Sequence, residues 1–416
     1  MKGQNKLFIA IIVALVVGVI MGGVVHTPYP ESSEGFSKNI KLLGTIFIRL
    51  VQMIIAPLVF TTLVVGIAKM SDIKMIGRVG SKAMLWFITA SLVSLTIGLV
   101  FVNWLEPGRV MQLAKPAADA AGEVVANSKG LSLEEFVKHI IPKSLFEAFA
   151  TNEVLQIVVF SIMFGIALAN MGEEYTKPIV RALDICAHAI LKMVGYIMWF
   201  APLGVLGAIA AVVATNGFDI FKVYAIYLRD FFFALAILWL VLCVVGYLIL
   251  GNRLFELLRR IKAPLLIAFS TTSSEAVFPK LVEELERFGC NNRIVSFILP
   301  LGYSFNLDGS MMYMTFAAIF IAQIYGIDMT LGQQIIMLLV LMLTSKGIAG
   351  VPRASLVIIV ATCTMFGIPP EGIALILPID HFCDMGRSMT NVLGNALATS
   401  AVSKWEGQLE NHGGDL

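Results

Sequence analysis

The last long apolar segment of the chain carries polar residues at a spacing that could bind a charged ligand. In the run DHFCDMGRSMTNVLGN, the polar positions have offsets of −4, 0, +3, +4, +7 and +11 and are Asp380, Asp384, Arg387, Ser388, Asn391 and Asn395. At about 100° per residue in an α-helix, they fall within about 100° of one another. The spacing therefore predicts one polar stripe along an otherwise apolar helix.

Three residues of this stripe are charged, and two of them, Asp384 and Arg387, are expected to face a partner other than lipid. An ionisable side chain at the centre of a bilayer costs at least about 2.5 to 3.5 kcal/mol. One interpretation is an internal ion pair that fixes helix packing. The other is a binding site, in which Arg387 donates two parallel hydrogen bonds to a carboxylate and Asp384 accepts one from an amine. Together with Asn391, the second interpretation describes a site for an acidic amino acid.

A second polar cluster, NLDGS, interrupts the apolar stretch from residue 294 to 324. Asp308 is the only acid in that stretch, and Gly309 beside it allows a helix to break. Carbonyl groups freed by such a break, together with one carboxylate, are oxygen ligands for a hard cation. The alternative is that Asp308 caps the second half of the broken helix.

A third cluster, STTSSE at residues 270–275, lies between Pro264 and Pro279. Its hydroxyl groups either present a helix N-terminus to an anionic ligand or simply cap that helix. Ligand contact is favoured for Ser273 and Ser274, whereas both interpretations stay open for Glu275.

The composition indicates the solvent in which these clusters lie. Of the 416 residues, 58% are hydrophobic and 14% charged, whereas soluble domains carry about 25% charged residues. The chain is therefore expected in lipid, which excludes a soluble multidomain protein and a disordered chain. Its net charge of +2 is spread along the sequence, so nucleic acid is not an expected partner. The five cysteines lie singly and the histidines lack metal-ligand spacing, so neither a cofactor nor a firm metal site is predicted.

The elements that must position the clusters are membrane helices. A bilayer core about 30 Å thick is crossed by about 20 apolar residues in an α-helix. Six uninterrupted apolar segments are close to this length, and two polar-centred segments follow them. The eight predicted spans are residues 7–25, 42–68, 83–105, 154–171, 193–217, 231–251, 294–324 and 373–405.

The last 160 residues or so differ from the rest because polar, glycine-rich or proline-flanked clusters interrupt each apolar stretch. Irregular backbone at membrane depth is tolerated only where protein buries it or where it lines a wet cavity. A hairpin with a polar tip followed by a polar-centred span occurs twice, at 264–284 with 294–324 and at 331–366 with 373–405. This order is typical of transporters with inverted repeats, in which interrupted segments mark the binding site.

Short loops rich in Lys and Arg indicate the cytoplasmic side. Such loops follow the second and sixth spans, at residues 69–82 and 253–262. Counting spans from these loops places both termini in the cytoplasm. The polar segment 106–130 is then an external loop, and the segment after it resembles an interfacial amphipathic helix.

The motifs SSE, NLDGSMMYMTFAAIFIAQ, SKGIAGVP and DMGRSMTNVLGNALA occur in this order. With them, essentially the whole chain resembles the dicarboxylate/amino acid:cation symporters, the glutamate transporter family, and is most similar to bacterial proton/glutamate-aspartate symporters. The resemblance implies a transporter, not an enzyme, with an all-α polytopic fold of eight transmembrane helices and two re-entrant hairpins. It also implies a homotrimer in the bacterial inner membrane.

The resemblance further implies an elevator mechanism, in which a transport domain carries the substrate across the membrane against a fixed scaffold. The scaffold would comprise residues 1–82 and 106–217, the transport domain 83–105 and 218–408, and a cytoplasmic tail 409–416. The second hairpin would be the gate.

By resemblance, Arg387 binds the side-chain carboxylate of the substrate, Asp384 its amino group, and Asn391 with Ser274 its main-chain carboxylate. Family members that carry C4-dicarboxylates lack the aspartate found at Asp384, so the resemblance favours glutamate or aspartate over succinate or malate. The implied substrate set is Thr272, Ser273, Ser274, Ser310, Val351, Pro352, Ser355, Asp384, Arg387, Ser388 and Asn391.

The coupling cation is where the sequence departs from the sodium-driven pattern. Sodium-coupled members carry an aspartate at the position of Asn395 and a threonine at that of Ala90, whereas proton-coupled members share Asn395 and Glu275. These residues favour a proton symporter with Glu275 as a candidate carrier, although Asn306 and Asp308 could still hold sodium. The residues implied in coupling are Glu275, Gly302, Asn306, Asp308, Asn391 and Asn395.

Three other functions remain as alternatives. One is a sodium-coupled aspartate, glutamate or C4-dicarboxylate symporter, and another is a channel. The third is an intramembrane protease with Asp308 and Asp384 as a catalytic dyad. Arg387, one turn from Asp384, argues against the dyad because it would hold that acid ionised.

Overall fold

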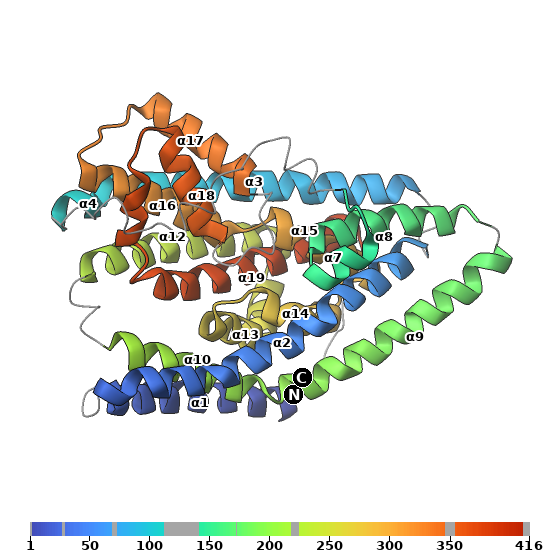
Figure 1. Ribbon diagram of the computed structural model, residues 1–416. Helices are drawn as coiled ribbons and strands as arrows, with labels where there is room; N and C mark the ends of the chain where they lie inside the picture. The colour runs from blue at the N-terminus through green and yellow to red at the C-terminus, as the bar shows by residue number, and fades with distance from the viewer. Residues whose placement is uncertain are drawn as a thin grey trace.

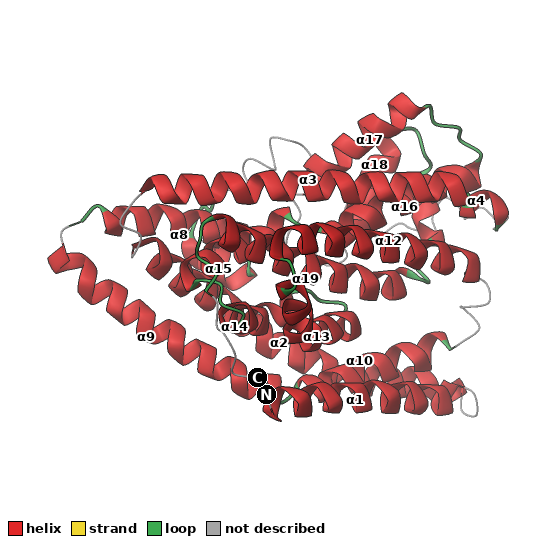
Figure 2. Ribbon diagram, turned by 180° about the vertical axis from the view of Figure 1, so that it is seen from behind, coloured by secondary structure: helices red, strands yellow, loops and turns green. Residues whose placement is uncertain are grey.

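The computed structural model describes residues 2–26, 30–68, 73–111, 141–171, 173–217, 224–345 and 354–410. Nearly all of these residues lie in helices (Figure 2), which confirms the predicted all-α class. The α-helices are α1 (Lys2–His26), α2 (Pro30–Ala68), α3 (Ile73–Leu105), α4 (Pro107–Val110), α7 (Leu145–Thr151), α8 (Val154–Ala169), α9 (Glu173–Met198), α10 (Ala201–Asn216), α12 (Ala225–Leu250), α13 (Arg253–Thr271), α14 (Phe278–Arg287), α15 (Asn292–Phe305), α16 (Asp308–Tyr325), α17 (Leu331–Thr344), α18 (Ala354–Met365) and α19 (Asp380–Trp405).

Within the described ranges, five stretches of helix are long and apolar enough to cross a membrane, and a sixth is added if the bent pair α9 and α10 forms one span. Several of these helices begin earlier than predicted. For example, α2 begins at Pro30 instead of residue 42, and α3 at Ile73 instead of residue 83. The prediction counted the apolar residues that match the hydrocarbon core, whereas the helices continue into their polar ends.

The predicted span 193–217 is wrong in its form, because the structure breaks it into two helices. The helices α9 and α10 meet at Trp199 and Phe200 and are bent by 49° relative to each other. Pro202 lies in the first turn of α10. A proline has no backbone N–H and clashes with the preceding turn, so it favours the start of a new helix there.

Small residues allow α1, α2 and α10 to pack closely at the lower edge of Figure 1. A Cβ atom on Gly22 of α1 would lie 2.7 Å from the carbonyl oxygen of Ala210, and one on Gly207 of α10 would lie 2.5 Å from that of Ile40. Larger side chains at these glycines would force the helices apart. Small residues at helix contacts are the usual basis of packing in lipid, where burial of apolar surface brings little gain.

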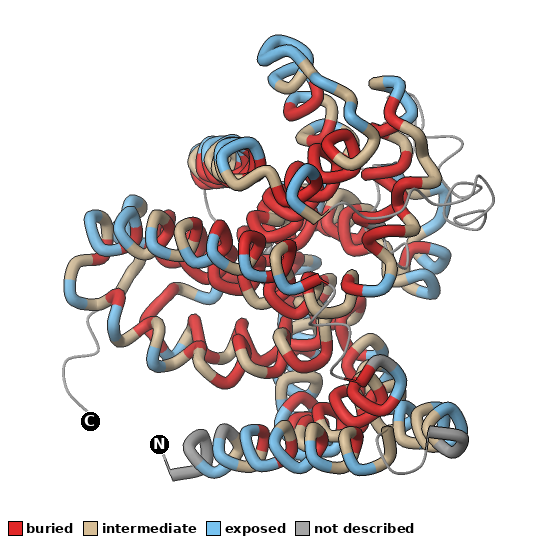
Figure 3. Tube along the Cα trace, turned by 90° about the vertical axis from the view of Figure 1, so that its left-hand side faces the viewer, coloured by how far each residue is buried: buried red, intermediate tan, exposed pale blue. Residues whose placement is uncertain are grey.

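The helices α3, α12, α15, α16 and α19 form a second group, in which α16 packs against α3, α12 and α19, and α15 packs against α3 and α19 (Figure 1). Every residue of α16 from Asp308 to Gln323 is buried, as expected for a helix that is apolar on all sides. Figure 3 shows buried residues concentrated where the helices pack together. The polar residues in this group are therefore enclosed by protein.

The predicted interruptions are confirmed where the structure describes them. The segment 294–324 breaks at Asn306 and Leu307, between α15 and α16. The first hairpin consists of α13, a 3-10 turn at Glu275–Val277 and α14, and it extends beyond the predicted 264–284 at both ends. At its tip, Thr272 has φ = 53°, in the left-handed region that ends α13.

The second hairpin and the last helix also differ in detail from the prediction. The helices α17 and α18 are its two arms, and its predicted tip, residues 346–353, lies outside the described residues. The last helix begins at Asp380 instead of residue 373, and Pro370–Leu375 form a 3-10 helix before it. The prolines at 369, 370 and 378 lack the N–H groups that a longer α-helix would need.

Candidate functional site

The predicted polar stripe is present on α19, and it faces α16 and the N-terminal end of α18. Ser388 and Asn391 are each 3% exposed, whereas the side chains of Arg387 and Asp384 are 17% and 21% exposed. The two buried residues anchor α19 to its neighbours. The two charged residues keep enough exposure to meet a ligand.

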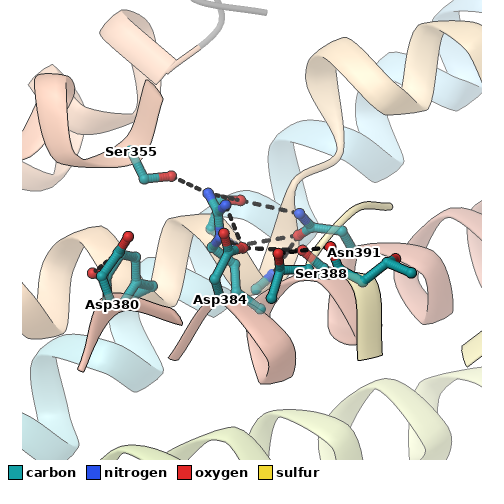
Figure 4. Close-up of polar contacts among 11 residues, drawn as sticks. Ser355, Asp380, Asp384, Ser388 and Asn391 are labelled. Atoms are coloured by element: carbon teal, nitrogen blue, oxygen red, sulfur yellow. Dashed lines mark hydrogen bonds and ion pairs between the residues drawn. The ribbon is translucent and has the colours of Figure 1, made fainter. Parts of the chain in front are cut away.

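Arg387 and Asp384 form an ion pair in which one carboxylate oxygen receives two hydrogen bonds. Nε and Nη2 of Arg387 lie 2.8 Å and 2.5 Å from Oδ1 of Asp384, and the hydroxyl of Ser388 donates to the same oxygen at 3.1 Å. Nη1 of Arg387 points away from the pair and donates to the hydroxyls of Ser355 and, at 3.5 Å, Ser310. Figure 4 shows Ser355 reaching this group from the second hairpin, above Asp384 and Ser388 on α19.

Asn391 joins the stripe to the N-terminus of α16. Its Oδ1 accepts hydrogen bonds from the backbone N–H groups of Gly309 and Ser310, at 2.9 and 3.3 Å, and its Nδ2 donates to the hydroxyl of Ser310 at 3.0 Å. Free N–H groups at a helix N-terminus also attract anions. The substrate residues predicted on α16, α18 and α19 are thus brought together.

A second polar group lies directly behind the first and is completely buried. Nδ2 of Asn306 donates to Oδ2 of Asp308 at 3.2 Å and to Oδ1 of Asn395 at 3.3 Å, and the hydroxyl of Ser94 on α3 donates to Oδ1 of Asp308 at 3.4 Å. Oδ1 of Asn306 and Nδ2 of Asn395 have no hydrogen-bond partner among the described residues. An unpaired buried amide oxygen beside a carboxylate fits an oxygen-ligated monovalent cation.

Three glycines permit the close approach of these elements. A Cβ atom on Gly394 would lie 1.8 Å from Oδ2 of Asp308, one on Gly302 2.3 Å from Oδ1 of Asn395, and one on Gly309 2.3 Å from the carbonyl oxygen of Arg387. Any side chain at these positions would push the two polar groups apart. The predicted coupling residue Gly302 is therefore needed for space and also accepts the N–H of Asn306 at 2.8 Å.

The first-hairpin residues of the predicted site make mainly local contacts. The hydroxyl of Thr272 donates to the carbonyl of Thr271, and that of Ser273 accepts the N–H of Ala276. The carbonyl of Ser274 accepts a hydrogen bond from the Tyr303 hydroxyl at 2.9 Å. Among the described residues, no hydrogen bond joins these three residues to the stripe on α19.

The remaining residues of the predicted set are Glu275, Val351 and Pro352. Glu275 is partly exposed at the hairpin tip, within electrostatic reach of Glu153 at the start of α8. Val351 and Pro352 lie outside the described residues. Their predicted contact with substrate is therefore still a prediction.

The structure adds residues that sequence reasoning missed. Ser94 contacts Asp308 from α3, and the Tyr313 hydroxyl donates to Oδ1 of Asp380 at 2.7 Å. Serine is common in membrane helices and tyrosine in buried cores, so neither residue type distinguished itself in the sequence. Asp308 and Asp384 belong to separate groups, and Asp384 is paired with Arg387, which argues against a shared-proton dyad.

The family described as the sodium:dicarboxylate symporter family matches residues 7–405. The chain belongs to this family. Its members are transporters, and this member is a multi-pass membrane protein of the dicarboxylate/glutamate symporter type.

Similar members of the family carry names with two kinds of substrate. The symporter is 39% identical to the C4-dicarboxylate transport protein of Bacillus subtilis (strain 168), covering 99% of this chain and 96% of that protein. It is 42% identical to the C4-dicarboxylate transport protein of Laribacter hongkongensis, covering 99% and 92%. It is also 39% identical to the proton/sodium-glutamate symport protein of Bacillus caldotenax, covering 97% and 95%. Identity alone therefore leaves substrate and cation open.

Proposed function

We propose that this symporter imports L-glutamate and L-aspartate together with protons. The observation that carries the proposal is the Asp384–Arg387 pair, which is partly exposed and lies beside the hydroxyls of Ser310 and Ser355. A guanidinium and a carboxylate on adjacent turns match the carboxylate and the amine of one acidic amino acid. A C4-dicarboxylate has no amine to pair with Asp384.

In the proposed binding step, the substrate replaces the internal ion pair. The side-chain carboxylate of the substrate takes the hydrogen bonds of Arg387, and its ammonium group donates to Asp384. Asn391 lies one turn beyond Arg387 on α19 and contacts the N-terminus of α16. Asn391 and the N–H groups of α16 would receive the main-chain carboxylate of the substrate. Charged partners are exchanged, so no charge is left unpaired.

The coupling part of the proposal is supported by Asn395. It is a neutral amide in contact with Asn306, at a position where the sodium-coupled members that the chain resembles carry an acid. Glu275, at the tip of the first hairpin, is the proposed proton carrier.

Sodium coupling is the second candidate, and the buried Asn306–Asp308–Ser94 group favours it. The oxygens of these three residues would hold the cation, with backbone carbonyls at the break between α15 and α16. The unpaired Oδ1 of Asn306 would be one ligand.

The proposed moving unit is the transport domain of residues 83–105 and 218–408, within a homotrimer whose termini are cytoplasmic. The helix α3 runs unbroken across position 83, and Arg78 and Lys82 bond to Glu406 at the end of α19. The N-terminal part of α3 would therefore move with this domain. Arg78 and Lys82 after span two and Arg253 after span six lie at the same end as residues 406–410, which is in keeping with one cytoplasmic side.

The test uses purified protein in liposomes with labelled L-aspartate, L-glutamate and succinate. Uptake is followed under an inward proton gradient without sodium and then under an inward sodium gradient at equal pH. Concentrative amino-acid uptake with protons alone is the expected result. Uptake that needs sodium would refute the proton coupling, and uptake of succinate alone would refute the substrate.

Glu275→Gln tests the proposed carrier. We expect it to keep exchanging internal for external substrate but to lose proton-driven accumulation. Glu283→Gln, in the second arm of the same hairpin, is the matched control and should accumulate normally. A Glu275→Gln protein with unchanged accumulation and unchanged pH dependence would rule out the carrier role.

A further inference from the structure

Residues 406–410, which follow α19, form a short strap across the end of the first hairpin. The N–H of Glu410 donates to the carbonyl of Gly289 at 2.9 Å, and the N–H of Asn291 donates to the carbonyl of Gln408 at 3.2 Å. Between them, Cys290 and Leu409 form the antiparallel bridge. The strap therefore pairs with the turn that connects α14 to α15.

Side chains and glycine make this pairing specific. Nδ2 of Asn291 donates to Oε1 of Gln408 at 3.1 Å, which adds a third hydrogen bond across the pair. Gly289 has φ = +106°, and a Cβ atom there would lie 2.4 Å from the carbonyl oxygen of Glu410. Only glycine lets the strap lie this close to the turn.

The strap is anchored at its other end to α3. The Glu406 carboxylate is 1% exposed and accepts hydrogen bonds from Arg78 at 2.8 Å and from Lys82 at 2.6 Å. Hydrogen bonds from Arg78, and then from Lys82, lower the pKa of Glu406 below its ordinary value of 4.5. Gly407, with φ = +66°, turns the chain from this anchor towards the hairpin.

The hairpin itself is fastened at the same place. Nη2 of Arg253, at the start of α13, donates to the carbonyl of Phe288 at 2.6 Å, and its guanidinium lies 4.6 Å from the centre of the Phe288 ring. This hydrogen bond joins the two arms of the hairpin at their base, and the strap pairs with the residues that directly follow Phe288. Such a small set of hydrogen bonds at a chain end can open without global unfolding.

We infer that the strap is a latch that holds the first hairpin closed at its base, so that releasing the strap lets substrate leak past this hairpin. The inference rests on the proposed function, in which the tip of the first hairpin holds the proton carrier Glu275, and on the predicted contact of Ser273 and Ser274 with substrate. With the strap in place, opening of the site is left to the second hairpin.

Cys290 provides a built-in reporter of the latch. It is 3% exposed beneath the strap, and burial raises the pKa of its thiol to about 11. Because the thiolate is the reactive form, a closed strap protects Cys290 from maleimide reagents in two ways. In a background with the other four cysteines replaced by alanine, the labelling rate measures opening of the strap.

The experiment compares full-length protein in liposomes with two variants that disturb the strap and one control for each. One chain ends after Glu406 and lacks the strap, and a control chain ends after Glu410 and keeps it. Gly289→Ala displaces the strap without truncation. Gly251→Ala is its control, since that glycine also has positive φ (+64°) but open space around it.

Each hydrogen bond contributes a factor of roughly 2 to 13 to the equilibrium constant for closing the strap. Losing three of them should therefore make labelling of Cys290 at least about tenfold faster. We expect this in the chain ending after Glu406 and in Gly289→Ala, together with faster leak of preloaded substrate when no gradient is imposed. Both controls should match the parent. Unchanged labelling, or faster labelling with unchanged leak, would overturn the latch. If the unmodified protein transports succinate instead of an amino acid, the proposed substrate is refuted. The latch is then still tested by the rate of Cys290 labelling and by the leak of preloaded succinate.

Discussion

The substitution Asp384→Asn separates the two substrate classes suggested by the relatives. In the structure, Oδ1 of Asp384 receives two hydrogen bonds from Arg387 and one from Ser388. An asparagine keeps the shape and the carbonyl oxygen but removes the charge. The substrate ammonium group loses a charged partner, and Arg387 loses the internal carboxylate that competes with a substrate carboxylate.

The size of the effect follows from these contacts. A hydrogen bond to a charged group contributes about 1.5 to 3 kcal/mol, so the ratio of aspartate to succinate affinity should fall roughly 10- to 150-fold. Both ligands gain a freed Arg387, but a dicarboxylate has no ammonium bond to Asp384 to lose. The internal pair is about one fifth exposed, so its strength lies between the surface and buried limits, about 1 to 3 kcal/mol. Succinate affinity should therefore stay level or rise.

The assay is binding of labelled L-aspartate and succinate to purified protein, with Asp380→Asn as the matched control. Asp380 lies one turn before Asp384 and accepts a hydrogen bond from Tyr313 instead of holding Arg387 in the ion pair described above. The expected result is a fall in the aspartate-to-succinate affinity ratio of at least about tenfold in Asp384→Asn alone. An equal loss for both ligands would show that Asp384 only holds Arg387 in place and would refute the assignment of the amine.

Three further substitutions test the buried cation group and the strap anchor. Ser94→Ala removes a hydrogen-bond donor to Asp308 and should raise the half-saturating cation concentration roughly two- to tenfold. The control is Ser161→Ala, which should leave this concentration unchanged because the Ser161 hydroxyl bonds only within its own helix. Equal half-saturating concentrations in the two variants would contradict the role of Ser94. Gly394→Ala should lower the free energy of unfolding by about 1 to 3 kcal/mol, since its Cβ would overlap the Asp308 carboxylate, and an unchanged melting temperature would argue against that packing. Glu406→Gln should lower the free energy of unfolding by about 1 to 3 kcal/mol at pH 7, measured by thermal unfolding as a function of pH. Because the pKa of Glu406 is lowered in the folded state, its carboxylate stabilises the fold above about pH 4.5, and this stabilisation is lost as the pH falls through the folded pKa. A difference in stability between the parent and Glu406→Gln that persists in strong acid would therefore contradict charge pairing at Glu406.

The sequence predicted best where one periodicity dominated. The stripe on α19 was predictable because six polar residues recur at helical spacing in an apolar segment, and the break at Asn306 because a glycine adjoins an acid. The contacts between these elements were not predictable from spacing. That Asn391 caps the N-terminus of α16 depends on tertiary packing of segments about 80 residues apart.

Helix boundaries and bends were the weaker part of the prediction. Hydropathy counts residues that suit the hydrocarbon core, so it shortened α2 and α3, whose polar ends continue beyond that core. The bend after α9 has a visible signal in Pro202, but a proline can equally kink a single span. The strap at 406–410 was not predicted, because the hydrogen bonds and the glycine that place it belong to segments far away in the sequence.

The two polar groups are close enough to explain why substrate and cation would bind together. Gly309 and Ser310 donate their N–H groups to Asn391 in the first group, and the preceding residue, Asp308, carries the carboxylate of the second. A ligand that draws Asn391 towards itself must therefore act on the N-terminus of α16 and on the Asp308 carboxylate with it. Glycine at 309 and 394 leaves no side chain to absorb such a shift. Since coupling between two sites is reciprocal, a cation that orders Asp308 would raise substrate affinity by the same factor that substrate raises cation affinity.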